Sequence, residues 1–407
     1  MSAGAPARAE GERARPLEGV RVLDASTVIA APLAGMILAD YGAEVIKIEH
    51  PVGGDPARTH GYDHDGVPLW WLMLGRNKKS VTLYLGSPEG QEIFRSLAAD
   101  ADVVIENFRP GTLERWGLGY DELSRDNPGL IMARVSGFGR TGPLVEEPGF
   151  GTMGETMSGF TFRNGDPEHP PHLPPFGLGD GVTGITCALA VVTALYERAR
   201  SGRGQEIDLA IIEPLLTVLE PQLITSDQLG HTLARTGNTA EMNAPRGLYQ
   251  ARDGAWVALS ASTTSTAARA MRLVGAPELA EAGWFDSARG RRAHVEQIDA
   301  AISAWFAGRD AAEAVTTCRA AGVPVAPVYC APDILADEQY EAIGTIGRYP
   351  HGRLGEVRMP APMFRLSATP GRVDWLGPEL GEHTDEVLGA AGVDSRRLAE
   401  LRRRGVV

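Results

Sequence analysis

The sequence predicts an α/β protein with a Rossmann-like, doubly wound parallel sheet, because short apolar runs alternate with helix-compatible stretches from residue 20 onward. The first example is the run 20–25 (VRVLDA), then a helical stretch, then the run 43–49 (AEVIKIE). A strand, a helix and a strand at this spacing imply parallel pairing through a right-handed crossover. The alternation stops after about residue 215, which predicts a second, smaller α+β domain.

The helices of the large domain carry recognisable ends. In the first helix, Pro32 suits the first turn and Gly42 the position after the last turn. Ser87 and Pro88 form an N-cap and first-turn pair for a helix that runs to Ala98. Further strands are predicted from apolar runs at 80–85, 103–107, 130–135 and 205–212.

A long apolar helix is expected to follow Asp180 and to end near Gly202. The later part of the chain predicts a β-hairpin over 247–260, with Asp253-Gly254 at its turn. Asp310 is the expected N-cap of a helix in the same region. The other elements expected there are a helix at 293–306, a helix at 311–321, a strand at 323–329 and a helical, basic C-terminal segment at 380–407.

Composition excludes several classes of protein. The formal net charge of −13 argues against a nucleic-acid partner, because phosphates favour a basic face. No apolar run approaches the ~18 residues of a membrane span, so no membrane partner is expected. The three cysteines match no zinc motif and indicate reduced thiols in a cytoplasm, with no bound metal. Residues 1–15 are small or charged and predict a disordered tail that is not a signal peptide.

Asp180 is the most informative single residue, because it lies between Gly179 and Gly181 at the mouth of the long helix. One interpretation is a simple helix N-cap, which aspartate commonly provides. The other is a reactive carboxylate. The glycines leave both flanks open to a substrate, and the helix N-terminus favours the ionised form. An ionised, approachable carboxylate is what a covalent nucleophile requires.

Other stretches carry weaker indications. Asn107 and Phe108 follow a predicted strand, where open α/β sheets bind ligands, and Arg109 and Arg115 are nearby cations. The alternative interpretation is a surface loop with solvated arginines. The stretch 135–143 (VSGFGRTGP) lacks the third glycine of a dinucleotide fingerprint. Motifs of serine hydrolases, P-loop proteins and zinc enzymes are absent from the sequence.

The chain contains, in order, the stretches VRVLDAS, AEVIKIEHP, GDPAR, RNKKSVTL, VIENFRPGTLERWGLGYDEL, VSGFGRTGP, GLGDGVTG and LGEHTDEVL. Together these stretches resemble class III CoA-transferases. This is the CaiB/BaiF family, which includes formyl-CoA transferase and carnitine CoA-transferase. The resemblance implies a large domain made from both chain ends, a small domain between them, and an interlocked homodimer. The implied boundaries are 16–212 for the first part of the large domain, 213–224 for a linker, 225–330 for the small domain and 331–407 for a second linker with the rest of the large domain. Long loops are expected at 213–246 and 331–375.

The resemblance also implies the chemistry and the site. Asp180 matches the family's nucleophile, which forms an aspartyl anhydride and then an aspartyl-CoA thioester. The matching CoA-binding positions are Ala30, His50, Leu83, Asn107, Phe108 and Arg115, with Arg115 as the candidate for a phosphate contact. The implied partners are an acyl-CoA and a small carboxylic acid, with coenzyme A as a substrate and no permanently bound cofactor.

The sequence departs from formyl-CoA transferases at four places. Ile29 replaces a glutamine of the first loop, and Gly86 replaces a lysine. Phe150-Gly151 replaces a tyrosine–glutamate pair, and 260–266 lacks a glycine-rich lid. Formyl-CoA and oxalate are therefore not the expected substrates, and a bulkier acyl group is favoured.

Two alternatives remain at this point. α-Methylacyl-CoA racemases share the fold and the aspartate, but proton transfer requires two bases. Their histidine has no counterpart at 149–151, and no acidic residue stands near Thr263. A non-catalytic acyl-CoA-binding protein would keep the CoA pocket without needing Asp180.

Overall fold

The computed structural model describes residues 14–407, so most of the tail expected at 1–15 lies outside the described residues. The chain forms two compact units. The first comprises the chain up to Ser158 together with Pro174–Val218 and Gln339–Val407, and therefore draws on both halves of the sequence. The second comprises Gly159–Leu173 and Leu219–Glu338.

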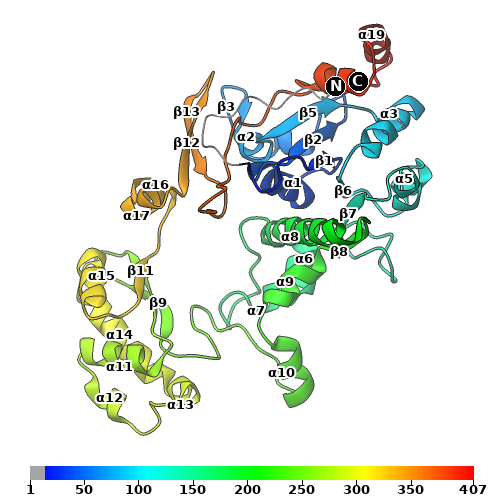
Figure 1. Cartoon of the computed structure of the whole chain (residues 1–407). Helices are drawn as coiled ribbons and strands as arrows, with labels where there is room; N and C mark the ends of the chain where they lie inside the picture. Colours follow the sequence, from blue (N-terminus) through cyan, green and yellow to red (C-terminus); the bar gives the residue numbers. More distant parts are fainter. Residues whose placement is uncertain (1–13) are drawn as a thin grey trace. The chain divides into compact units, whose positions relative to one another are not determined.

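The first unit is built on a six-stranded sheet in which every pairing is parallel (Figure 1). Counted along the chain, the strands lie in the order 3-2-1-4-5-6, which is the order of dinucleotide-binding Rossmann folds. Its switch point falls between β1 and β6. From edge to edge the strands are β5 (Lys78–Thr82), β2 (Glu44–Glu49), β1 (Arg21–Asp24), β6 (Val103–Glu106), β7 (Ile131–Ser136) and β8 (Glu206–Ala210).

Successive strand residues serve opposite faces of this sheet, as the two-residue period of a strand requires. Val22 and Val45 pack with α1 (Ala30–Asp40) and α8 (Leu178–Ser201) on one face. Their neighbours Leu23 and Ile46 pack on the other face with α3, α5, α18 and α19. Those helices are α3 (Pro88–Ala99), α5 (Tyr120–Asp126), α18 (Thr384–Ala390) and α19 (Ser395–Arg403). The predicted doubly wound parallel sheet is confirmed.

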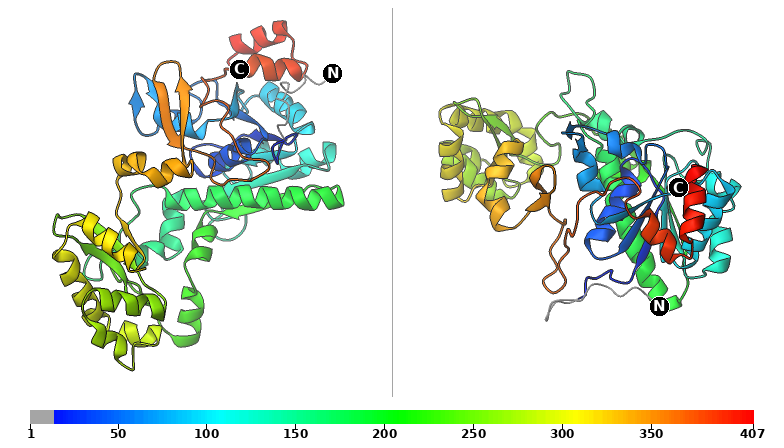
Figure 2. Two further views of the ribbon diagram at one scale, coloured as in Figure 1. Left: turned by 60° about the vertical axis from the view of Figure 1, so that its left-hand side comes forward. Right: turned by 90° about the horizontal axis from the view of Figure 1, so that it is seen from above.

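The helix α8 is the longest element and lies along the sheet (Figure 2). By length and composition alone it could cross a membrane, so the expectation that no segment approaches this limit was too strict. The segment mixes glycine and threonine with its apolar residues, which hides it from a search for an unbroken apolar run. In this fold α8 is a core helix that buries Cys187, Ala188 and Val191 against α1 and the sheet.

The close packing of α1 on α8 depends on Gly184. A Cβ at that position would lie 2.6 Å from the carbonyl oxygen of Ala30 and 2.8 Å from the Leu33 side chain. Real side chains do not approach so closely, so only glycine permits this backbone contact. The start of α1 is thereby fixed against α8 one turn beyond Asp180.

The C-terminal segment covers the edge strand β5. The backbone N–H of Thr82 donates to Thr384 Oγ1 at 3.0 Å, and the N–H of His383 donates to the Ser80 carbonyl at 2.9 Å. The edge therefore keeps few open hydrogen-bonding groups. The remaining elements of this unit are η1 (Pro56–Thr59), β3 (Asp63–His64), β4 (Val67–Pro68), α2 (Leu69–Leu74), α4 (Thr112–Arg115), α6 (Gly151–Met157), α9 (Ile212–Val218), β12 (Ile346–His351) and β13 (Gly355–Pro360).

The strand expected at 80–85 begins and ends earlier than predicted, since β5 spans Lys78–Thr82. Lys78 reads as a surface residue in the sequence, but its ammonium is fully buried and lies 2.8 Å from Asp24 Oδ2. This ion pair lets a lysine begin a buried strand. The residues from Leu83 to Gly86 instead leave the sheet and line a cavity described below.

The second unit holds a three-stranded antiparallel sheet in the order β11-β10-β9. The predicted hairpin is confirmed, with Gly254 at φ 84° in its turn. Asp310 occupies the N-cap of α15, although its side chain makes no cap hydrogen bond and pairs with Arg252 instead. The elements of this unit are α7 (Phe160–Arg163), α10 (Gln222–Leu229), β9 (Arg246–Gln250), β10 (Trp256–Ser260), α11 (Thr264–Leu273), α12 (Pro277–Glu281), α13 (Ala288–Ala293), α14 (Val295–Ala307), α15 (Ala311–Ala320), β11 (Val325–Pro327) and α16 (Ala331–Ala336).

The segments 213–246 and 331–375, expected as long loops, contain regular structure. The first holds α10 and most of α9, and the second holds α16, α17 (Glu338–Ala342) and the β12–β13 hairpin. These elements have five to eight residues each, and a hydrophobic period is hard to detect over so short a window.

Candidate active site

Two adjoining cavities lie at the carboxyl ends of the parallel strands, where open α/β sheets bind ligands. The smaller, which we call the His50 cavity, has a volume of about 130 Å³. The larger, the Asp180 cavity, has a volume of about 340 Å³. Thr27 and Phe108 line both cavities and form their common wall.

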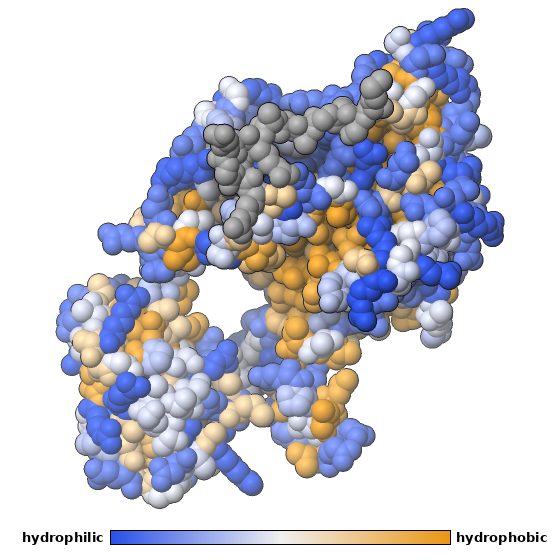
Figure 3. Space-filling view, viewed as in Figure 1, coloured by the Kyte–Doolittle hydropathy of each residue, from blue (hydrophilic) through white to orange (hydrophobic). Residues whose placement is uncertain are grey.

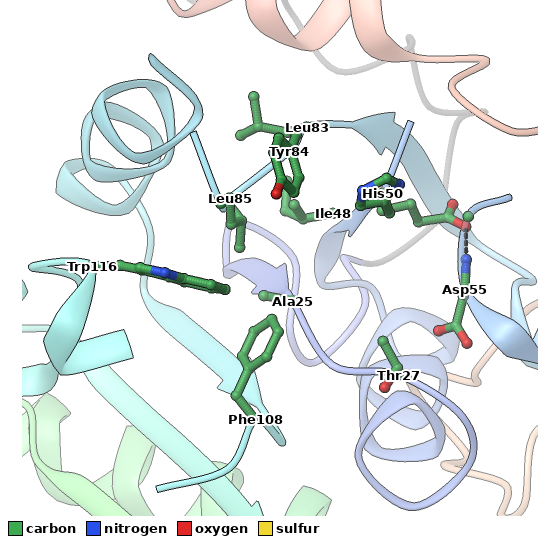
Figure 4. Close-up of a pocket in the computed structure, with 13 residues that line it drawn as sticks. Ala25, Thr27, Ile48, His50, Asp55, Leu83, Tyr84, Leu85, Phe108 and Trp116 are labelled. Carbon is green, nitrogen blue, oxygen red and sulfur yellow. Dashed lines mark hydrogen bonds between the residues drawn. The ribbon is translucent and has the colours of Figure 1, made fainter. Parts of the chain in front are cut away.

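The His50 cavity has apolar and aromatic walls (Figure 4). The His50 and Tyr84 rings meet edge to face with centroids 5.0 Å apart, and Phe108 and Trp116 do the same at 5.4 Å. Aromatic rings held in this way offer faces on which a planar ligand ring can stack. The other apolar residues of this cavity are Ala25, Ile48, Leu83 and Leu85.

Asp180 stands on the wall of the larger cavity, at the third position of α8. Gly177 is the N-cap, so the interpretation of Asp180 as a simple N-cap is wrong. The capping contact comes from another helix, because Glu155 Oε1 of α6 accepts the backbone N–H of Gly179 at 3.0 Å. The Asp180 carboxylate is therefore not consumed in capping its own helix.

Glycines surround the Asp180 carboxylate. A Cβ at Gly151 would lie 2.4 Å from Asp180 Oδ2, and a Cβ at Gly177 would lie 3.0 Å from the same atom. A Cβ at Gly179 would lie 2.4 Å from the Gly151 carbonyl oxygen, so this flank serves backbone packing and not substrate access. The flank of Gly181 meets nothing within 4 Å. Of the two flanks expected to be open to a substrate, the structure leaves only the second one open.

The surroundings of Asp180 shift its acidity. Burial raises the pKa of Asp180 to about 6, and the nearby charge of Glu155 acts in the same direction. The backbone N–H of Gly151 and the charge of His60 lower the pKa by smaller amounts. Asp180 is thus mostly ionised at neutral pH, and it becomes half protonated when the pH falls by about one unit. Such a carboxylate can act as a nucleophile or as a general base.

A buried ion network lies under the loop 26–29 that joins β1 to α1. Lys47 Nζ lies 2.9 Å from Asp55 Oδ2 and 3.7 Å from Asp24 Oδ1, and all three side chains are fully buried. Burial lowers the pKa of Lys47, but the charges of Asp24 and Asp55 outweigh burial and hold the pKa above its usual value. Lys47 is therefore charged at neutral pH within the core, beside the two carboxylates.

Five of the six residues expected to bind CoA line one or both of the cavities. Ala30 and Asn107 line the Asp180 cavity, His50 and Leu83 line the His50 cavity, and Phe108 lines both. Arg115 lines neither cavity. Its side chain is exposed, and its Nη2 donates to Thr112 Oγ1 at 2.9 Å.

Several residues of the site were not singled out from the sequence. Glu155 and Tyr84 stand in no motif, and only the tertiary fold brings them here. Trp116 lies in the stretch VIENFRPGTLERWGLGYDEL, so its position in that motif could have identified it. Asp55 lines the His50 cavity and belongs to the stretch GDPAR, so its position in that motif could have identified it. Across residues 14–407, no group of three His, Cys, Asp or Glu side chains is arranged to hold a metal ion.

The fold and the site define a Rossmann-type α/β protein with a half-buried carboxylate on the wall of a cavity at the carboxyl ends of its strands. The profile of CoA-transferase family III matches residues 17–384. The chain belongs to this family, and it is a CoA-transferase that moves CoA between acyl-CoA and carboxylic acids.

Individual relatives agree with this assignment. A succinyl-CoA–D-citramalate CoA-transferase of Chloroflexus aurantiacus is 42% identical over 97% of this chain and 98% of its own length. A succinate–glutarate CoA-transferase of Agrobacterium fabrum is 33% identical over 92% of this chain and 96% of its own length. A CaiB/BaiF family protein from Brucella suis has a similar crystal structure, with a TM-score of 0.81, 31% identity, and coverage of 93% of this chain and 100% of that one.

Proposed function

We propose that this chain transfers CoA from succinyl-CoA to a second small dicarboxylic acid, with the Asp180 carboxylate as the covalent acceptor. The observation that carries the proposal is the position of Asp180 on the wall of a cavity, beside the open flank of Gly181. The carboxylate is half-buried, with a pKa of about 6, so it is ionised at neutral pH but poorly solvated. Partial desolvation makes an anion a better nucleophile than it is in water.

The reaction runs in four balanced steps. The Asp180 carboxylate attacks the succinyl-CoA carbonyl, which forms an anhydride C–O bond and breaks the C–S bond to release CoA thiolate. The thiolate attacks the Asp180 carbonyl of the anhydride, which forms an aspartyl-CoA thioester and releases succinate. The acceptor carboxylate attacks this thioester and releases CoA thiolate again. The thiolate then attacks the acceptor carbonyl of the new anhydride, which gives the product thioester and frees Asp180.

We assign the CoA moiety to the two cavities together. The aromatic walls of the His50 cavity suit the adenine ring, with Leu83 and Phe108 as further contacts. Ala30 and Asn107 flank the path from there to Asp180. Arg115 is exposed, and beside the bond from its Nη2 to Thr112 the guanidinium has further N–H groups that can meet a CoA phosphate at the outer end of the site.

The proposed acyl group follows from the relatives and from the cavity. The relatives are named for succinyl-CoA or succinate, citramalate and glutarate, and the acids in these names are all dicarboxylic. Ile29 and Phe150 line the Asp180 cavity and present apolar surface to the carbon chain of such an acid. The cavity volume of about 340 Å³ accommodates a four- or five-carbon acyl group more naturally than a formyl group.

We further propose an interlocked homodimer in the cytoplasm. One face of α8 exposes four apolar side chains at helical spacing, which we call the α8 stripe: Ile185, Leu189, Val192 and Tyr196. Figure 3 shows hydrophobic surface gathered over the region of α1 and α8. Exposed apolar stripes of this kind mark association surfaces. The three cysteines are free, as expected for a reducing compartment.

Proton transfer at the α-carbon is the second candidate. It is favoured by one observation: the charge of His60 acts on Asp180, so a second titratable group stands near the first. The two reactions are separated by incubating the protein with succinyl-CoA and labelled glutarate or citramalate in deuterated water. CoA transfer without deuterium at the α-carbon is the expected result. Deuterium uptake without transfer would support the isomerase instead.

A further inference from the structure

We propose that Asp55 is a positioning residue for the transfer reaction, because it holds the loop 26–29 in the conformation that places Ile29 and Ala30 on the wall of the Asp180 cavity. The loop joins β1 to α1, and Asp55 reaches it from the segment after β2. The inference deepens the proposed function and rests on it, since Asp180 is taken as the reacting group.

The loop contains a residue in a disfavoured conformation. Val28 has φ 74°, in the left-handed region where the Cβ of an L-residue crowds the backbone. In the described part of the chain, four residues other than glycine have positive φ, and the other three are Asp65, Asn77 and Glu220. Val28 alone among them is β-branched, which makes its conformation the least favourable. Such a residue persists only where its surroundings hold it.

Asp55 supplies that hold. Its Oδ1 accepts the backbone N–H of Val28 at 3.0 Å and that of Ala57 at 2.9 Å. Its other oxygen lies 2.9 Å from Lys47 Nζ, which also donates to the Ser26 carbonyl. Asp55 is 1% exposed and Lys47 is 0% exposed, so water cannot take over either contact. One carboxylate thus connects the strained residue to a buried, fixed charge.

The neighbouring residue has a separate anchor. Thr27 exchanges two hydrogen bonds with the Asn107 side chain, both at 2.8 Å. Asn107 therefore fixes Thr27, while Asp55 fixes the next peptide. Loss of Asp55 leaves Val28 free to return to a negative φ. That rotation would displace Ile29 and Ala30, which line the cavity beside Asp180. Displacements of about 1 Å at a reacting site can lower turnover by about 100-fold.

The test is a double-mutant cycle of Asp55→Ala and Val28→Gly, read by steady-state kinetics with succinyl-CoA and glutarate. Glycine adopts positive φ without strain, so it removes the need for a hold at position 28. We expect Asp55→Ala to lower kcat by about 10–100-fold in the wild-type background and by less than about threefold in the Val28→Gly background. A residue needed only for folding would not be rescued by Val28→Gly, which adds no contact.

Hydrogen exchange of the segment 26–31 gives a readout that does not depend on activity. Asp55→Ala should speed exchange there, and the control Asp63→Ala should not, because Asp63 supports an exposed turn at Gly66 away from both cavities. Equal loss of kcat in both backgrounds, or unchanged exchange, overturns the positioning role. Absence of transfer by the wild-type protein would contradict the proposed function, while exchange would still decide the role of Asp55.

If Asp55→Ala fails to fold, the variant Val28→Pro tests the positioning role of Asp55 instead. Proline cannot adopt φ 74° and lacks the N–H that Asp55 accepts, yet the substitution leaves the Lys47–Asp55 ion pair intact. We expect a folded protein with kcat reduced by about 10-fold or more. Wild-type kcat in Val28→Pro would overturn the proposal.

Discussion

The pKa of Asp180 reflects burial and three neighbours. Substituting two of these neighbours should shift that pKa in opposite directions. Burial raises its pKa to about 6, Glu155 adds to the rise, and His60 opposes it. Because only the carboxylate can attack a thioester, kcat/KM should fall about tenfold per pH unit below this pKa and level off above it.

Substitution should move this pH midpoint predictably. Glu155→Gln removes a negative charge and can still accept the Gly179 N–H, so the pKa of Asp180 and the midpoint should fall. His60→Gln removes the side chain that lowers the pKa of Asp180, and should raise both. Rates measured from pH 4.5 to 8 for the two variants check this. Midpoints that move together, or not at all, would contradict the assignment of the titration to Asp180.

The raised pKa of Asp180 also has a consequence for stability. A carboxylate whose pKa is higher in the folded state destabilises the fold once the pH exceeds its unfolded value of 3.8, and the full cost is present above about 6. Asp180→Asn should therefore raise the free energy of unfolding at pH 7.5 by about 1–2 kcal/mol, measured by chemical denaturation, while the variant loses activity. The gain should vanish near pH 4. Lower stability of the variant at pH 7.5 would contradict this account.

The properties of individual site residues could be predicted from the sequence only in part. The glycines beside Asp180 indicated an approachable carboxylate, and the motifs around it indicated a nucleophile. The cap that frees Asp180 could not be foreseen, because Glu155 belongs to another helix and stands in no motif. The strained Val28 was equally hidden, since valine predicts a negative φ.

At the scale of elements, two adjacent lysines of β5 differ in burial, and comparing them shows what a buried ion pair contributes relative to a surface one. Lys78 is fully buried and pairs with Asp24 at 2.8 Å. Lys79 is partly exposed and pairs with Glu44 and Glu386. Removing one partner of a buried pair leaves an uncompensated charge, whereas a surface pair contributes little.

Matched substitutions should show this difference. Lys78→Met should lower the free energy of unfolding by about 3–5 kcal/mol, and Lys79→Met by about 0–1 kcal/mol. Chemical denaturation followed by circular dichroism measures both. Equal losses in the two variants would contradict the buried role of Lys78.

The strands and long helices were predictable because their apolar runs have a clear period. The sheet strands lie within a few residues of their expected positions. The start of β5 was missed because a buried ion pair replaced an apolar residue, and the short elements after residue 330 were missed because they offer too few periodic positions.

At the scale of the whole molecule, the α8 stripe should mediate self-association. Leu189 is 65% exposed at the centre of the stripe. Leu189→Glu should shift the mass measured by light scattering from twice the chain mass toward a single chain, or lower the melting temperature. Leu335→Glu, on α16, is the matched control and should leave the mass unchanged. A monomeric wild-type protein would contradict the proposed dimer.

The doubly wound class followed from alternating elements, but the strand order did not. The order 3-2-1-4-5-6 depends on which faces of the helices meet the sheet, and single-sequence patterns do not specify that choice. Residues 159–173 belong to the second unit, although the rest of that unit begins only at residue 219. Patterns in a single sequence do not indicate such a long-range association either.

The central claim is that Asp180 forms covalent bonds with the acyl group and then with CoA. It is tested by incubating the protein with succinyl-CoA, quenching rapidly and mapping the adducts by peptide mass spectrometry. The account predicts a CoA adduct on the peptide that carries Asp180, removed by an acceptor acid and absent from Asp180→Asn. Full CoA transfer with no adduct on Asp180, or an unchanged rate in Asp180→Asn, would contradict it.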